Sequence, residues 1–279
     1  MDYKELHGMV EAYYSSNVLR EWNRLGKKGT LGWLEHYTTL RYLKKYLPKK
    51  GLILDGGSGP GRYGVELAAM GYKVLMLDPV RENLEFAKRV AKRDNILENI
   101  AGFTVGRIEN LSQIESESFD AVISLGAPLS HIMNARMRRK AALELIRVAK
   151  YNAPIFVSVI GRLQLISGLL IVSPKELAEP YVSTWLKSGD FKGKPVFTPY
   201  HGFLPEELTS LFDSDNFRKI SMVSLEGLSS WNEPALKRLH ANKKLFCAWL
   251  KLHMDSCGEP SILGASNHIM LIGKRVHKI

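Results

Sequence analysis

The sequence predicts an α/β fold in which a doubly wound, mostly parallel sheet carries helices on both faces. Two observations favour this fold. Short apolar runs that end in a carboxylate or a glycine alternate with amphipathic helical patterns, as in a series of β-α-β units. The first run, 51–55, leads into a glycine-rich loop, 56–61, and then into a helical pattern. This order of strand, glycine loop and helix is typical of a site for a nucleotide-type cofactor.

Length and composition indicate a globular chain with a full hydrophobic core. Its 279 residues are 45% hydrophobic and 24% charged, enough for the core of one α/β domain with an elaboration. Apolar runs are too short for a membrane span, the N-terminus does not resemble a signal peptide, and cysteines occur only at 247 and 257. We therefore expect a cytoplasmic protein that does not enter membranes. The net charge of +11 would suit nucleic acid or anionic substrates, but basic residues spread over solvated faces are the simpler explanation.

Two helices are expected ahead of the first strand. The pattern predicts one helix over about 3–25, a glycine-bearing turn over 26–29, and a second helix over about 31–47 that ends before Pro48. We assign 1–50 as an N-terminal helical cover over the cofactor cleft and 51–279 as the main domain. Side chains of this cover that could meet a ligand are Tyr13, Tyr14, Trp22, Arg24, Glu35 and Tyr37.

The rest of the chain continues the alternation of strands and helices. Strands are predicted over 73–78, 100–105, 118–126, 153–160, 217–225 and 268–274, and helices over 81–93, 137–150, from Pro205, and over 233–254. Between 162 and 203 the pattern breaks into short helical runs and loops with several prolines and aromatic residues. Loops on a rigid sheet often carry specificity, so this insertion after the fifth strand is expected to face the substrate.

The glycine loop by itself leaves two cofactor classes open. Residues 59–64 match G-x-G-x-x-G, and Asp78 follows at the spacing of a ribose-binding acid, so an NAD(P)-binding oxidoreductase is a competing hypothesis. Against it, Asp55 would place a negative charge near the pyrophosphate of a dinucleotide. The loop over 56–61 is also longer than the tight turn of a dinucleotide site. A cofactor-binding protein without catalysis is a third possibility that no residue excludes.

The motifs resemble those of class I S-adenosylmethionine-dependent methyltransferases. Residues 54–61, L-D-G-G-S-G-P-G, are similar to the first motif of that family, L-D-x-G-x-G-x-G, and 119–122, F-D-A-V, are similar to its F-D-x-V. The resemblance implies a Rossmann-like seven-stranded sheet, S-adenosylmethionine as cofactor, and methyl transfer as the reaction.

The resemblance also implies a set of cofactor-binding residues. The donor would lie against Asp55, Gly56, Gly57, Ser58, Gly59 and Gly61, with Asp78 and Pro79 at its ribose, Leu125 and Gly126 beside its methyl group, and Tyr13 over it. In the family an acid after the third strand binds adenine. Here Arg107 stands in its place, which leaves adenine to the backbone near Ile108 or to stacking by Arg107.

Candidates for chemistry are His131, His201 and Tyr200. A base is useful only if the acceptor arrives protonated. His131 ends a run, 125–131, that resembles the L-G-N-S-x-x-H loop of glycine N-methyltransferase-like enzymes but lacks its asparagine. It could be a base or an orienting group, or a histidine that only caps or packs. No acid cluster with ligand-like spacing lies beside these residues in the sequence, so we predict no metal.

Two features favour a small-molecule acceptor with a nitrogen or oxygen nucleophile. Methylation of a base amine in this fold goes with [DNS]-P-P-[YFW] after the fourth strand, where this chain has S-L-G-A-P at 124–128. Carbon methylation of pyrimidines would need a cysteine near that strand, and none is there. An RNA or protein methyltransferase is the alternative. The sequence does not indicate an oligomeric state.

Overall fold

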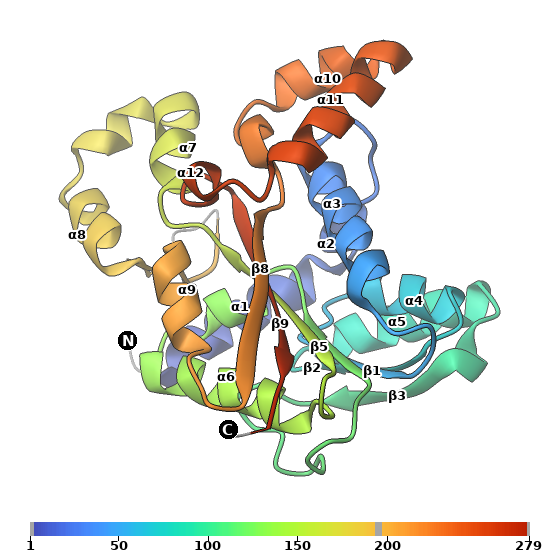
Figure 1. Ribbon diagram of the computed structural model, residues 1–279. Coiled ribbons are helices and arrows are strands. Elements are labelled where there is room, and N and C mark those ends of the chain that lie inside the picture. The colour runs from blue at the N-terminus through green and yellow to red at the C-terminus, as the bar shows by residue number, and fades with distance from the viewer. Residues whose placement is uncertain (1–2, 193–196, 278–279) are drawn as a thin grey trace.

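The computed structural model describes residues 3–192 and 197–277, and its centre is a seven-stranded sheet in the order β3-β2-β1-β4-β5-β9-β8 (Figure 1). The strands are β1 (Leu52–Gly56), β2 (Lys73–Asp78), β3 (Ile100–Val105), β4 (Ala121–Ser124), β5 (Pro154–Ile160), β8 (Phe217–Ser224) and β9 (His268–Arg275). β1 to β5 pair in parallel, and β9 runs antiparallel to β5 and β8. The predicted doubly wound, mostly parallel sheet of seven strands is confirmed.

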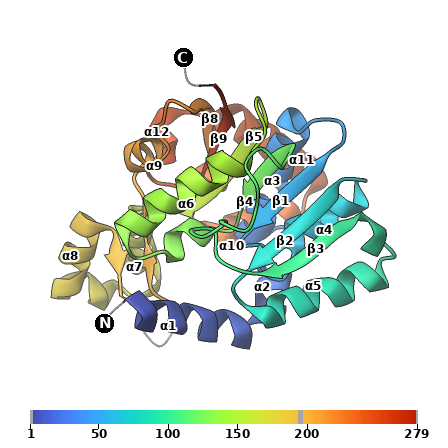
Figure 2. The ribbon, with the colours of Figure 1, turned by 90° about the horizontal axis from the view of Figure 1, so that it is seen from below.

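Apolar side chains on the two faces of the sheet form separate cores. Side chains alternate along a strand, so Ile155 and Val157 of β5 belong to one core and Phe156 to the other. The helices that supply these cores are α3 (Leu31–Tyr46), α4 (Arg62–Ala69), α5 (Arg81–Arg93), α6 (Ala135–Val148) and α9 (Pro205–Leu211). Figure 2 shows α6 in front of the sheet, on the opposite face from α3.

The predicted single helix over 3–25 is wrong. The chain forms α1 (Tyr3–Ser16) and α2 (Val18–Arg24), with a break at Asn17. The Ser16 hydroxyl donates to the carbonyl of Ala12 at 2.9 Å, and the Asn17 side-chain amide donates to the carbonyl of Tyr13 at 2.8 Å. Such local side-chain bonds compete with the helical backbone pattern, so this polar stretch ends one helix and lets the next start at a new angle.

The predicted long helix over 233–254 is also two helices, α10 (Glu233–His240) and α11 (Lys243–Ser256). The side-chain oxygen of Asn242 accepts hydrogen bonds from the backbone N–H groups of Lys244 and Leu245 at 3.1 and 3.2 Å. Asn242 is therefore the N-cap of a new helix, and a short helix α12 (Pro260–Leu263) follows.

The insertion contains short elements, as expected. They are α7 (Gln164–Val172), α8 (Pro180–Ser188) and a two-stranded sheet of β6 (Asp190–Phe191) and β7 (Tyr200–His201), while 193–196 lie outside the described residues. Because β5 leads to α7 and β8 leads toward α10, the insertion and the α10–α11 pair both extend beyond the carboxyl edge of the sheet (Figure 1). None of the helices in the described chain is long and apolar enough to cross a membrane.

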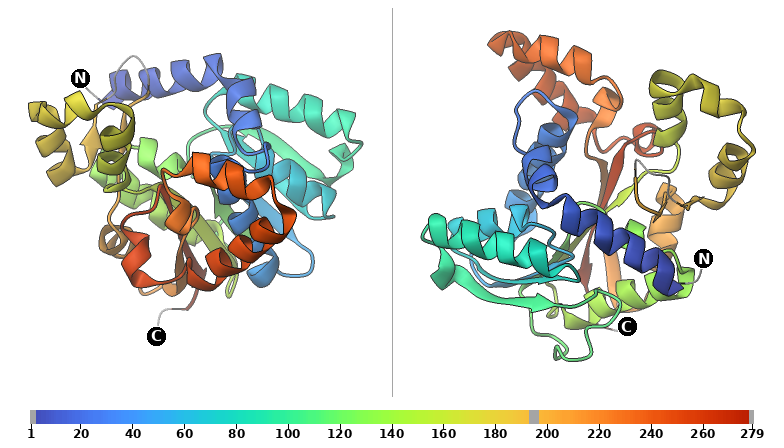
Figure 3. Two further views of the ribbon diagram at one scale, coloured as in Figure 1. Left: turned by 90° about the horizontal axis from the view of Figure 1, so that it is seen from above. Right: turned by 180° about the vertical axis from the view of Figure 1, so that it is seen from behind.

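The strand order changes direction at β1, which marks a topological switch point at this edge. β1 lies between β2 and β4, and the chain winds in opposite directions from β1 to either side. In open α/β sheets ligands bind outside the carboxyl ends of the strands at such a reversal. Helix α1 runs across this edge, from α5 to the insertion (Figure 3).

Candidate functional site

The loop between β1 and α4 folds back onto the end of β2. The backbone N–H of Gly57 donates to the carbonyl of Leu77 at 2.7 Å, and that of Gly59 donates to Oδ2 of Asp78 at 2.7 Å. Gly57, Gly59 and Gly61 have φ angles of 75°, 52° and 82°, in the left-handed region that favours glycine. The glycines therefore shape a loop that is tied to the carboxylate at the end of the neighbouring strand.

Two of these glycines differ in the space around them. A Cβ at Gly57 would lie 2.5 Å from the Cβ of Pro128, whereas a Cβ at Gly59 would have no heavy atom of the described residues within 4 Å. Gly57 lets the loop pack against the chain after β4. Gly59 lines a pocket, and the space beside its Cα is open.

This pocket lies at the carboxyl edge of the sheet. Eight of the predicted site residues line it: Gly57, Ser58, Gly59, Asp78, Pro79, Leu125, Gly126 and His131. The segment ahead of β1 also lines the pocket, through Val10, Tyr14, Glu21, Arg24 and Leu25. Of these five residues, the sequence analysis named Tyr14 and Arg24 as able to meet a ligand. The glycine loop, the end of β2, the chain after β4 and the N-terminal helices thus share one cavity.

Asp78 and Asn83 present acceptor atoms at one end of the pocket. The buried Asp78 carboxylate accepts hydrogen bonds from the backbone N–H groups of Gly59 and Val80, at 2.7 and 2.9 Å, and from the Asn83 side-chain amide at 3.1 Å. Burial raises the pKa of Asp78 above its usual range, although these bonds act in the opposite direction. The buried Oδ1 of Asn83 has no hydrogen-bond partner among the described residues, so it can accept from a ligand.

Asp55 is buried at the end of β1 and is not among the residues that line the pocket. Burial first, and the nearby charge of Asp78 second, raise its pKa to about 7. A hydrogen bond from the backbone of Gly64 acts in the opposite direction. A buried carboxyl with a raised pKa fits a ligand that brings a positive charge close to this strand end.

His131 is held between α1 and the insertion. Its Nδ1 lies 3.0 Å from the carbonyl oxygen of Pro199, and its Nε2 lies 2.8 Å from the Tyr14 hydroxyl. A carbonyl can only accept, so Nδ1 carries the proton, Nε2 accepts, and Tyr14 donates. Burial lowers the pKa of His131 to about 4, which keeps the imidazole neutral at physiological pH.

His201 and Tyr200, the other candidates for chemistry, lie in the insertion outside the pocket lining. Nδ1 of His201 contacts Asp190 at 2.6 Å and Nε2 contacts Glu207 at 2.8 Å, so the ring bridges two carboxylates and has no nitrogen left for an acceptor. The ring of Tyr200 packs between aromatic neighbours, including Phe197 at 5.6 Å between centroids. Both residues therefore hold the insertion together in this structure.

The remaining predicted cofactor contacts also lie outside the pocket lining. Gly56 and Gly61 face the protein interior, where a Cβ would meet Ile108 at 2.9 Å and Ala87 at 2.7 Å, respectively. Ile108 itself belongs to the core. Tyr13 packs edge-on against Phe197, with ring centroids 5.5 Å apart.

Arg107, which replaces the expected adenine-binding acid, pairs with Glu11 and His7 of α1. Its guanidinium is thus committed to the helix that crosses the carboxyl edge, and it does not line the pocket. This pairing was not expected from the sequence. Through these contacts Arg107 holds α1 against the chain that follows β3.

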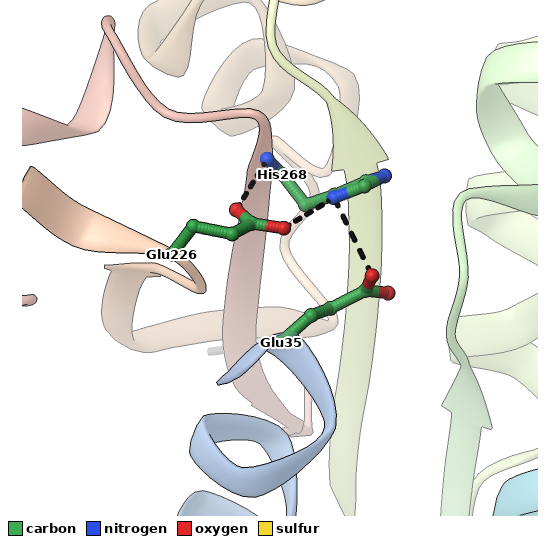
Figure 4. Close-up of side chains that lie close together, drawn as sticks. All are labelled: Glu35, Glu226 and His268. Carbon is green, nitrogen blue, oxygen red and sulfur yellow. Dashed lines mark hydrogen bonds and ion pairs between the residues drawn. The ribbon is translucent and has the colours of Figure 1, made fainter. Parts of the chain in front are cut away.

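An ionic network links Glu35 of α3, Glu226 after β8 and His268 of β9 (Figure 4). Glu226 accepts from Nδ1 of His268 at 2.6 Å, and Glu35 lies 3.6 Å from the same nitrogen. Glu35 also pairs with Arg24, which lines the pocket. Burial alone would lower the pKa of His268, but Glu35 and Glu226 raise it above its usual value.

The three residues Glu35, Glu226 and His268 offer ligand atoms within 4.8 Å of one another, as a metal site would. Positive charge already faces these carboxylates, however, because Arg24 pairs with Glu35 and with Glu21, and Nδ1 of His268 contacts Glu226. A metal ion would have to displace the proton of His268 and would face the Arg24 guanidinium. We therefore interpret the cluster as an ion-pair network that positions Arg24 at the pocket wall.

The strand order, the antiparallel β9 and the glycine loop after β1 together define the class I methyltransferase fold. Residues 53–152 match a family model described as a methyltransferase domain. Residues 53–152 therefore belong to a methyltransferase domain with the class I fold, as the motifs indicated.

Curated relatives are similar over part of the chain. The human mitochondrial ubiquinone biosynthesis O-methyltransferase is 27% identical over 203 residues, which is 70% of this chain and 51% of that protein. The ubiquinone biosynthesis O-methyltransferase of Rickettsia akari is 29% identical over 134 residues, 48% of each protein. The chain spans about half the length of these relatives.

Solved structures share the fold. An S-adenosylmethionine-dependent methyltransferase from Methanosarcina mazei aligns over 84% of this chain and 97% of its own, with a TM-score of 0.59 and 19% identity. The 1,6-didemethyltoxoflavin-N1-methyltransferase of Burkholderia thailandensis, crystallised with S-adenosylhomocysteine, aligns over 99% and 92%, with a TM-score of 0.60 and 12% identity. Identities this low support the fold and not a substrate.

Proposed function

We propose that this protein transfers a methyl group from S-adenosylmethionine to a hydroxyl group of a small molecule. The observation that carries the proposal is the pocket at the reversal of the sheet, walled by Gly59, Asp78 and Gly126 on the methyltransferase fold. The names of the curated relatives, which are O-methyltransferases, support oxygen as the acceptor atom. A dinucleotide oxidoreductase typically has an all-parallel sheet, whereas β9 here runs antiparallel, so the alternative of NAD(P) chemistry has less support.

The residues of the pocket fit the donor group by group. Asp78 and the unpartnered Oδ1 of Asn83 suit the ribose hydroxyls, which need acceptors. The Arg24 guanidinium in the pocket wall suits the carboxylate of the amino-acid moiety, and the buried Asp55, outside the pocket lining at the end of β1, suits its positive end. The open side of Gly59 allows the ligand to lie against the backbone.

Bound S-adenosylmethionine would supply an electrophilic methyl group on its sulfonium. The protein's part is then to align an acceptor with that carbon and to exclude water from the cleft. The chain after β4, with Gly126 and His131, is the wall beside which the acceptor would lie. We further propose that α1 and α2 form the cover of this cleft and that the insertion over 162–203 faces the acceptor.

Calorimetric titration tests the donor. S-adenosylmethionine and S-adenosylhomocysteine should bind, and NAD and NADP should not. Asp78→Ala should weaken binding of S-adenosylhomocysteine by about 1.5–3 kcal/mol for each charged hydrogen bond lost. Asp94→Ala, which removes an exposed carboxylate paired with Arg93 at the end of α5, is the matched control and should bind normally.

Because Asp78 also holds the glycine loop, folding of each variant must be checked by circular dichroism and thermal unfolding. A folded Asp78→Ala with the affinity of the wild type would remove Asp78 from the ribose site. Binding of NAD in preference to S-adenosylhomocysteine would overturn the proposed function.

A further inference from the structure

Tyr14 and His131 come from positions 117 residues apart and meet in the wall of the pocket. Gly126 and Pro128, from the chain after β4, line the same pocket. Our proposed function assigns the wall formed by this chain to the acceptor, and His131 belongs to that wall.

The hydrogen-bond partners fix where the protons are. Pro199 has only its carbonyl oxygen to offer Nδ1 of His131, so Nδ1 is the protonated nitrogen. The lone pair of Nε2 is taken by the Tyr14 hydroxyl at 2.8 Å. A bound acceptor consequently cannot use His131 directly, but it can donate to the oxygen of Tyr14, which keeps an acceptor lone pair.

We propose that Tyr14 is a catalytic residue that takes the proton of a hydroxyl acceptor while passing its own proton to His131. This inference rests on the proposed methyl transfer and adds the residues that make the acceptor nucleophilic. The acceptor oxygen bonds the methyl carbon as the carbon–sulfur bond breaks, and the electron pair of that bond stays on sulfur. The hydroxyl proton moves to the Tyr14 oxygen, and the Tyr14 proton moves to Nε2 of His131.

His131 acts through Tyr14 and is a positioning residue that completes the relay. Once protonated, it still donates from Nδ1 to Pro199, so the geometry of the ring is unchanged by the transfer. An imidazole with a low pKa can still take up this proton. An acceptor oxygen that gained the methyl group and kept its proton would be a far stronger acid than the imidazolium. The charged and titratable groups around the pair are His7 and Tyr13 from α1, Glu21 and Arg24 from α2, Asp78 from β2 and His268 from β9.

The relay distinguishes acceptor classes. An amine in its free-base form has a lone pair ready for attack and can lose its proton to water after methylation. A hydroxyl gains most from losing its proton during the attack. Tyr13 and Phe197 pack against Tyr14 and His131 outside the pocket lining, and the ring of Tyr14 in the pocket wall suits contact with an aromatic hydroxyl compound.

The test compares two acceptors of nearly the same shape, 4-nitrocatechol and 4-nitro-1,2-phenylenediamine, with labelled S-adenosylmethionine. With 4-nitrocatechol, Tyr14→Phe should lower kcat by about 10²–10⁴-fold and alter the pH profile, with little change in the Kd of S-adenosylhomocysteine. His131→Gln should lower kcat to a similar extent, and the double variant should be no worse than either single one because the residues act as a unit. Tyr46→Phe, which removes a hydroxyl from a tyrosine of α3 outside the pocket, is the matched control.

Wild-type kcat and pH profile in Tyr14→Phe, or additive losses in the double variant, would overturn the relay. So would transfer to the diamine alone, or no transfer to 4-nitrocatechol by an enzyme that binds S-adenosylhomocysteine. Failure to bind S-adenosylhomocysteine would instead count against the proposed function. Nitrogen-15 NMR of the histidine rings gives a readout without substrate: His131 should be neutral with its proton on Nδ1 at pH 7, and a proton on Nε2 would contradict the assignment.

Discussion

Two histidines, His131 in the pocket wall and His268 in the ionic network that includes Arg24, have pKa values shifted in opposite directions. His131, in the pocket wall, has a carbonyl and a hydroxyl as partners, and its pKa is lowered to about 4. His268, in the ionic network, has two glutamates as partners, and its pKa is raised. Burial lowers the pKa of both rings, so the partners decide the outcome.

The two histidines mark two kinds of region. The pocket wall at His131 is suited to proton transfer, and the ionic network at His268 is suited to holding Arg24 in position. The neutral His131 has a lone pair that can take up a proton through Tyr14. In the network Arg24 pairs with Glu35 and His268 with Glu226, and these pairs fix Arg24 in the wall of the pocket. A buried network of this kind is costly to break, because removing one member leaves the others charged and unpaired.

The largest expected effect comes from breaking the network. Glu35→Gln keeps the size of the side chain but leaves Arg24 and His268 short of a counter-charge. We expect the free energy of unfolding to fall by about 3–5 kcal/mol at pH 7, measured by urea denaturation. Glu21→Gln, which removes the more exposed partner of Arg24 at 3.2 Å, should cost about 1 kcal/mol or less. Equal losses in the two variants would mean that the network is no more than a set of ordinary ion pairs.

The next effect sharpens the comparison through pH. An unfolded chain binds a proton at His131 near pH 6.5, and the folded protein only near pH 4. The contribution of His131 to stability is therefore full above pH 6.5 and is lost as the pH falls toward 4, by about 3 kcal/mol in all. His268 has the opposite sign: its contribution is full below pH 6.5 and is lost as the pH rises through its raised pKa.

Urea denaturation between pH 4.5 and 8.5 would resolve these two arms. In His131→Gln the fall in the free energy of unfolding below pH 6.5, the acid arm, should become shallower. It should not vanish, because His253, also with a pKa lowered to about 4, contributes with the same sign. His268→Gln should leave the acid arm and change the alkaline one. An acid arm in His131→Gln as steep as that of the wild type would show that the neutral state of His131 is not linked to folding.

The smallest effect concerns motion. Helix α1 is seated by Tyr14 on His131 and by Glu11 on Arg107, whereas Leu34 and Leu43 of α3 are fully buried. Added S-adenosylhomocysteine should slow amide hydrogen exchange over α1 and α2, on the order of 1 kcal/mol in opening free energy, and leave α3 unchanged. Equal protection of α1 with and without ligand would make it a static packing element and not a cover.

Local patterns in the sequence determined most of the fold. The run that ends at Asp55, the glycine loop and the acid-terminated β2 predicted the region that we propose binds the cofactor, because strand period, glycine and strand end are properties of neighbouring residues. The same patterns placed β2, β3 and α5 at their observed bounds. They missed the breaks at Asn17 and Asn242, where a few side-chain hydrogen bonds decide between one helix and two.

The chemistry of the pocket was decided by the tertiary structure. Sequence analysis could propose His131 as a base, but its tautomer and charge depend on Tyr14 and on the carbonyl of Pro199, which only folding brings to it. Glu226 and His268 carry no local signal, and they matter because β9 places them beside Glu35. A pattern along the chain reports which face of an element is buried. The charge of a buried group depends on partners distant in sequence, since their electric fields act through space.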